Sequence, residues 1–149
     1  MTKKLIGLLT LILLVTVLSG YLSSLSNSVY DNDQKMIQVD DRYTAVKKTG
    51  GVEDRGAFYD YEDFNGVDTV FTIQGNQTVS ITVYKNVSEG RLKVVLVDPY
   101  ENVRELDETT VFSGIPGNYK VKIVGDHASG LVSIDIEAVT DTYYPNFIK

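Results

Sequence analysis

The chain has 149 residues, which is enough for one domain, and it contains no cysteine, which excludes disulfides, thiolate metal sites and thiol catalysis. Its net charge is −6, and Lys3 and Lys4 are the only charged residues before residue 29, so the rest of the chain carries 12 basic and 20 acidic side chains. This negative field argues against binding to nucleic acid, or to anionic lipid through a basic patch.

The first 28 residues have the pattern of a secretory signal. Lys3 and Lys4 precede an uncharged, Leu-rich run over residues 5–18, and small residues dominate from residue 19 to residue 28. A positive start, an apolar middle and a small-residue end predict export. We therefore expect residues 1–28 to be an apolar signal or anchor helix. The rest should be extracytoplasmic, either secreted or held on the outer face of the cytoplasmic membrane.

The fate of this segment has two alternatives. The sequence LSGY at residues 18–21 resembles the signal of bacterial lipoproteins, but Tyr21 stands where the lipid-modified Cys would be, which implies either that lipidation has been lost or that this residue was changed. Signal peptidase could cut behind Ser26 or Ser28, each of which has a serine two positions earlier. Alternatively, residues 5–25 could stay in the membrane, because about 20 apolar residues span a bilayer.

Residues 29–56 are polar, mixed in charge and poor in periodicity. We interpret them as a flexible tether with one short strand around residues 43–47. The glycines at positions 50 and 51 are expected to end whatever structure precedes them.

The rest of the chain, residues 57–149, alternates apolar and polar side chains with the period of a β-strand. No segment shows apolar residues at helical spacing, and turn-forming sequences separate the alternating segments, including GDHASG at residues 125–130. These features predict an all-β, antiparallel sandwich or jelly roll of about 7–8 strands. The expected strands cover residues 67–74, 77–84, 91–97, 118–124 and 131–139.

Three consecutive sequences carry a resemblance to a known family. DTVFTIQGNQTVSITV, GRLKVVLVDPYENV and PGNYKVKIVGDHASGLVSIDI resemble, in that order, the bacterial pre-peptidase C-terminal (PPC) domain over about residues 68–138. The resemblance implies a non-catalytic sandwich that aids export or binds surface polymers, and one collagen-binding relative holds calcium partly through an acidic linker. This chain departs from the family because no enzyme is attached to the domain.

The sequence GAFYDYEDFNG at residues 56–66 is the best candidate for a ligand site. In a strand, Tyr59, Tyr61 and Asp63 would share one face, where rings could stack on sugars and a carboxylate could accept hydrogen bonds from hydroxyl groups. The alternative is that this is the first strand of the sandwich, with its aromatic rings in the core.

Metal and acid–base chemistry have weaker signals. Asp60, Glu62, Asp63 and Asp68 could offer oxygen ligands to calcium, but their spacing does not fit an EF-hand loop, and solvated acids are the simpler interpretation. The single histidine, His127, lies in a predicted hairpin loop without the partners of a catalytic triad. We expect no cofactor and no enzymatic activity.

The sequence thus predicts a non-catalytic extracytoplasmic domain that binds a surface polysaccharide or a protein polymer. The alternative is a structural or partner-binding subunit of a cell-surface complex, joined through an edge strand or a sheet face. The membrane is a further partner if the N-terminal segment is retained.

Overall fold

The computed structural model describes residues 28–38, 40–75, 78–113, 116–139 and 147–148. Apart from Ser28, the expected signal or anchor helix lies outside these residues. Within them, no helix is long and apolar enough to cross a bilayer.

The prediction of an all-β, antiparallel fold is confirmed. Eight strands among the described residues belong to a single antiparallel sheet, in which β3, β7 and β4 lie side by side at the centre. The strands are β1 (Arg42–Thr44), β2 (Lys47–Val52), β3 (Gly56–Gln74), β4 (Thr78–Val97), β5 (Val103–Leu106), β6 (Glu108–Ser113), β7 (Asn118–Ala138) and β8 (Phe147–Ile148).

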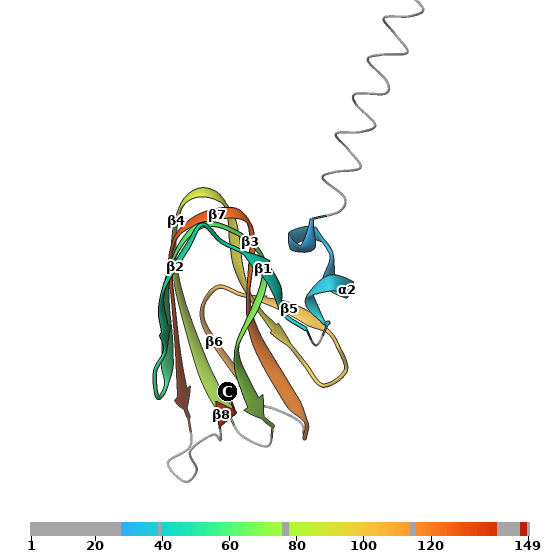
Figure 1. The fold of residues 1–149 in the computed structure, drawn as a ribbon. Helices are drawn as coiled ribbons and strands as arrows, with labels where there is room; N and C mark the ends of the chain where they lie inside the picture. Colours follow the sequence, from blue (N-terminus) through green and yellow to red (C-terminus); the bar gives the residue numbers. More distant parts are fainter. Residues whose placement is uncertain (1–27, 39, 76–77, 114–115, 140–146, 149) are drawn as a thin grey trace, which may run out of the picture.

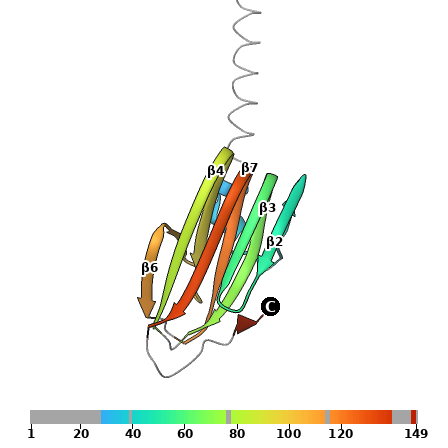
Figure 2. The same ribbon diagram turned by 90° about the vertical axis from the view of Figure 1, so that its left-hand side faces the viewer.

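The sheet is folded over on itself, so that it forms a sandwich-like pair of layers (Figure 1). The three central strands run through both layers and arch together at one end of the molecule. The first layer has the order β2–β3–β7–β4–β6 (Figure 2). The second layer continues the same three strands and adds β1 and β8 beside β3, and β5 beside β4.

The arch is built where the sequence predicted turns. The sequences SEG at residues 88–90 and GDHASG at residues 125–130 lie inside β4 and β7, so the expected loops there are wrong. The ladders of these strands slip in register near the arch, as β-bulges do. Asp63 and His127 adopt φ of 50°, which allows the backbone to turn sharply without ending the strand.

The main core lies between the two layers. It contains the apolar faces predicted from alternation, such as Val79 and Ile81 in β4 and Val121 and Ile123 in β7, all fully buried. A bulge between Thr69 and Phe71 changes the face of β3, so Phe71 enters this core, whereas Val67 packs on the opposite side of the second layer.

The tether predicted over residues 29–56 is also wrong, because most of this segment is part of the folded domain. β1 and β2 pair with β3. Before them, the 3₁₀ helix η1 (Val29–Asp31) and the single-turn helix α2 (Asp33–Met36) lie on the outer face of the second layer. We call residues 28–41, of which residue 39 is not described, the strap.

The strap closes a second apolar cluster. The Met36 side chain is fully buried against the outward-facing valines of the second layer. The strap covers Val95 and Val97 of β4, so this part of the strand is buried on both faces. The cluster consists of Met36, Val67, Val95, Val97 and Val124.

Candidate functional site

The residues first considered for ligand binding lie in two different environments. Tyr59 and Tyr61 are 7% and 2% exposed and belong to the main core, whereas Asp63 is exposed at the arch. The predicted common face is broken because the φ of Asp63 is positive and the strand turns there. In this conformation the two tyrosine rings therefore offer no open face to a sugar.

Tyr59 and Tyr61 instead surround a cation that belongs to the protein. The Lys48 Nζ lies 4.5 Å from the centroid of the Tyr59 ring, 4.8 Å from that of Tyr43 and 5.9 Å from that of Tyr61. The same Nζ forms an ion pair with the buried Asp68 carboxylate, which also accepts a hydrogen bond of 3.1 Å from the Tyr61 hydroxyl. Cation–π attraction and charge pairing thus hold Lys48 among the three rings and the Asp68 carboxylate.

The pKa values in this cluster reflect burial and charge. Burial raises the pKa of the Tyr61 phenol, and the neighbouring Asp68 carboxylate raises it further. For Lys48, burial alone would lower the pKa, but the hydrogen bond and the charge of Asp68 outweigh burial and raise it. Lys48 is therefore a charged structural lysine, not a neutral amine available as a base.

The four acids considered as calcium ligands do not converge. Asp60 pairs with Lys47 at 3.8 Å on the outer face of the first layer, and Asp68 is buried with Lys48. Asp63 contacts His127, while the Glu62 side chain is exposed. No cluster of three potential metal-binding side chains occurs among the described residues.

His127 and Asp63 form a pair on the outside of the arch. The His127 Nδ1 lies 2.7 Å from Asp63 Oδ1, and the Asp63 backbone N–H donates to Ser129 Oγ at 3.1 Å. Both side chains are more than half exposed. The pair spans β3 and β7 and joins the two strands where they bend.

A different aromatic pair does lie on the surface. Phe58 in β3 and Tyr84 in β4 are 50% and 63% exposed, and both face outward because their neighbours Ala57, Tyr59 and Val83 are buried. Both residues are Cα partners of Ser133 in β7, so they occupy one row across the first layer. Since adjacent strands lie about 5 Å apart, their Cα atoms are separated by about 10 Å across the small serine.

Polar groups surround this aromatic row. Asp60 lies two residues after Phe58 in β3, and Asp135 lies two residues after Ser133 in β7, on the same outward face. Beyond Asp135 the surface is hollowed, with a volume of about 660 Å³. The hollow is lined by Glu53, Asp54, Arg55, Gly56 and Asp135.

Sequence reasoning did not propose Phe58 or Tyr84 as site residues, although alternation places Tyr84 on the polar face of its strand. The signal was present in the alternation, because an aromatic residue on the polar face of a strand has no core to enter. The alternation became informative only when the strand register placed the two residues opposite the same serine.

No family model matches the sequence, and no curated protein is detectably similar to it.

Proposed function

We propose that this protein is a non-catalytic extracytoplasmic domain that binds a neutral surface polysaccharide on the outer face of the first layer. The observation that carries the proposal is the row formed by Phe58, Ser133 and Tyr84. Two exposed aromatic residues whose Cα atoms lie about 10 Å apart offer stacking positions for alternate sugars of an extended chain. The small serine between them leaves room for the sugar that joins the two stacked ones.

The surroundings of the row suit sugar hydroxyl groups. Asp60 and Asp135 supply carboxylate acceptors, and Thr82 supplies a hydroxyl group on the same face. The negative charge of the chain favours neutral polymers over polyanionic ones. The export signal and the resemblance to PPC domains support the same role.

The test is binding of the purified protein to a panel of neutral and anionic polysaccharides, measured by affinity electrophoresis. We expect retardation by a neutral polymer, and we expect Phe58→Ala and Tyr84→Ala each to weaken binding about tenfold, which corresponds to about 1.4 kcal/mol. Tyr100→Ala is the matched control, because Tyr100 is an exposed tyrosine in the turn after β4. Binding that survives the double variant, or no retardation by any neutral polymer, would refute the proposal.

A second candidate function is attachment to a protein partner through an edge strand. Among the described residues, β6 pairs only with β4, and its outward-facing Val111 is 58% exposed. An unpaired edge with an apolar side chain can accept another strand. Under this alternative, Val111→Lys would abolish co-purification with an envelope protein, while Phe58→Ala and Tyr84→Ala would leave it unchanged.

A further inference from the structure

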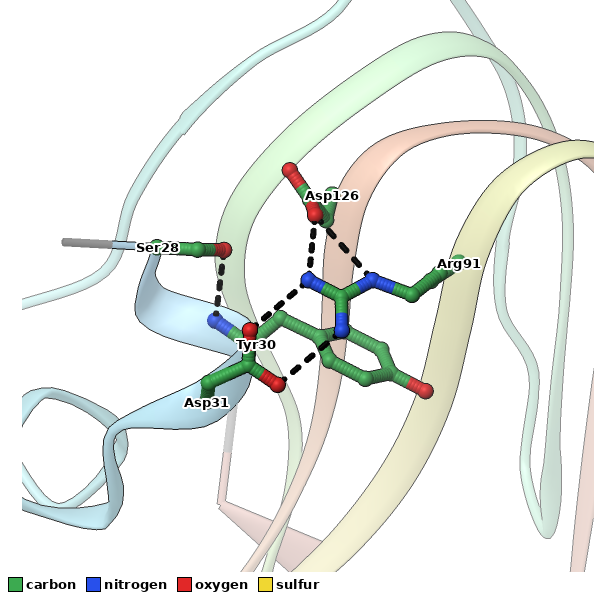
Figure 3. Close-up of polar contacts among 5 residues, drawn as sticks. All are labelled: Ser28, Tyr30, Asp31, Arg91 and Asp126. Carbon is green, nitrogen blue, oxygen red and sulfur yellow. Dashed lines mark hydrogen bonds and ion pairs between the residues drawn. The ribbon is translucent and has the colours of Figure 1, made fainter. Parts of the chain in front are cut away.

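The strap is fixed at the arched end of the sandwich by one arginine. Arg91 lies in β4 just after the bend, opposite Asp126 in β7. Its guanidinium group donates two hydrogen bonds to the Asp31 carboxylate, of 3.0 Å and 2.8 Å, and two to Asp126 Oδ2, of 3.1 Å and 2.6 Å (Figure 3). The bidentate contact with Asp31, together with the contact on Asp126, sets the direction in which η1 approaches the sheet.

The residues next to Asp31 are also held in place. The Arg91 guanidinium lies over the Tyr30 ring, 4.4 Å from its centroid, and Lys93 Nζ approaches the same ring to 4.6 Å. The Ser28 hydroxyl oxygen accepts a hydrogen bond from the Tyr30 backbone N–H at 3.2 Å, as Figure 3 shows. Ser28 is therefore held in the folded domain through Tyr30.

The other end of the strap is equally constrained. The Lys122 ammonium group, fully buried in the second layer, donates to the Gln38 carbonyl oxygen at 2.8 Å. The Thr69 hydroxyl donates to Asp41 Oδ1 at 2.6 Å. Met36 is buried between these contacts, so the described residues of the strap are held against the second layer along their length.

We propose that in the membrane-anchored form of this protein, which retains residues 1–27, the arched end of the sandwich faces the phospholipid surface at close range. In this form residues 5–25 span the bilayer, so three Cα–Cα steps lead from the end of the span to Ser28 and cover at most about 11 Å. η1 lies beside the arch, and β8 lies at the opposite end (Figures 1 and 2).

The short covalent connection to the membrane span brings the arch close to the lipid surface. Electrostatic attraction to the lipid does not. Asp63 and Glu89 are exposed at the arch, so the end that faces the lipid is not a basic patch. The opposite end, with the turn at residues 98–102, stands farther out by the length of half a central strand, about 30 Å. The proposal does not depend on polysaccharide binding, but it would orient the Phe58–Tyr84 face sideways, parallel to the membrane normal.

The test uses the full chain in phosphatidylcholine vesicles that contain a headgroup-attached quencher. Because the chain has no cysteine, Ser88→Cys at the arch and Tyr100→Cys at the far end can each carry a single fluorophore. Intact mass confirms that residues 1–27 are present in the sample. We expect several-fold stronger quenching at position 88 than at position 100.

A second pair of samples tests the strap itself. Asp31→Asn combined with Arg91→Gln should release η1 and reduce the quenching difference, while Arg104→Gln, at an exposed arginine of β5, should leave it unchanged. Circular dichroism verifies that each variant keeps its β structure. Equal quenching at both positions in the unmodified protein would overturn the proposal, as would a difference that survives release of the clamp. Recovery from the native host of a protein that has lost residues 1–27 altogether would also overturn it, because no anchored form would exist.

Discussion

At the scale of single residues, Lys48 and Asp68 show how a charge can be placed inside a small sandwich. Asp68 is nearly inaccessible to solvent and accepts contacts from both Lys48 and the Tyr61 hydroxyl. A buried carboxylate is tolerated only when it is paired and hydrogen-bonded. Removing Lys48 would therefore leave the buried Asp68 carboxylate without its charge partner.

Replacing Lys48 by Met should destabilise the domain by about 3 kcal/mol, because Asp68 would lose its charge partner while it stays buried. The double variant Lys48→Met with Asp68→Asn should recover most of this loss, because the stranded charge is then removed. Urea denaturation measures both effects. A single variant within 0.5 kcal/mol of the wild-type protein would show that Asp68 does not depend on Lys48.

Alkaline pH should destabilise the protein through Tyr61. The raised pKa means that, above about pH 10, a tyrosine in the unfolded chain loses its proton while Tyr61 in the folded protein keeps it. The unfolded state then binds fewer protons, so stability falls as pH rises, by up to about 1.4 kcal/mol per pH unit. Tyr61→Phe should flatten this dependence in urea titrations at pH 9 to 11, and an unchanged slope would contradict the assignment.

At the scale of elements, the arch depends on positions where the backbone is in the left-handed region or where only a small residue fits. Gly90 has φ of 68°, and a Cβ added there would lie 2.0 Å from the His127 carbonyl oxygen. Gly51, in the edge strand β2, has no atom within 4 Å of such a Cβ. The two glycines therefore separate the effect of the arch from the general effect of adding a methyl group.

Gly90→Ala should destabilise the domain by about 2 kcal/mol or more, since it combines left-handed strain with a backbone clash. Gly51→Ala should change stability by less than about 0.5 kcal/mol. Thermal unfolding of the two variants side by side measures the difference. Equal effects would mean that the arch can adjust its backbone around position 90.

Alternation predicted the strands well where one face is buried, as in residues 77–84 and 118–124. It could not predict that strands continue through glycine-rich stretches, because a glycine at positive φ serves a turn and a bulged bend equally well. It also missed β5 and β6, whose sequences VREL and ETTVFS are short, partly charged and mostly exposed. Edge strands of this kind depend on a neighbour for their structure, and the neighbour is not visible in the local pattern.

The candidate site was predicted only in part, for a related reason. The sequence placed Tyr59 and Tyr61 on one face of a strand, which is correct, but a strand pattern does not say which face is the outer one when both carry aromatic rings. Val46 and Phe58 are exposed, while Tyr61 and Phe64 are buried, although all are large and apolar or aromatic. The pairing of β3 with β2 and β7 decides between the two faces.

At the scale of the whole molecule, the strap is a structural part of the domain. It covers Val67, Val95, Val97 and Val124, which would otherwise form an apolar strip on the outer face of the second layer. The Asp31–Arg91 ion pair is about 40% exposed and mainly sets the direction of η1, whereas most of the strap's stability comes from the burial of Met36 and these valines.

A chain that begins at residue 42 should therefore self-associate, whereas one that begins at residue 28 should stay monomeric at the same concentration. The physical reason is the exposed valine strip, which would be covered by a second copy. Size-exclusion chromatography with light scattering distinguishes the two states. A monomeric chain from residue 42 with unchanged stability would show that the strap is dispensable.

The continuity of β3, β4 and β7 through both layers also has a consequence for how the protein assembles. In a sandwich of two separate sheets, the strands of each sheet can set their register before the two sheets pack together. Here the same three segments build both halves, so a strand that pairs one step out of place in one half would carry the error around the arch and turn its oily side chains outward in the other. The register of each central strand must therefore be correct in both layers at once, and the two layers should fold and unfold as one cooperative unit.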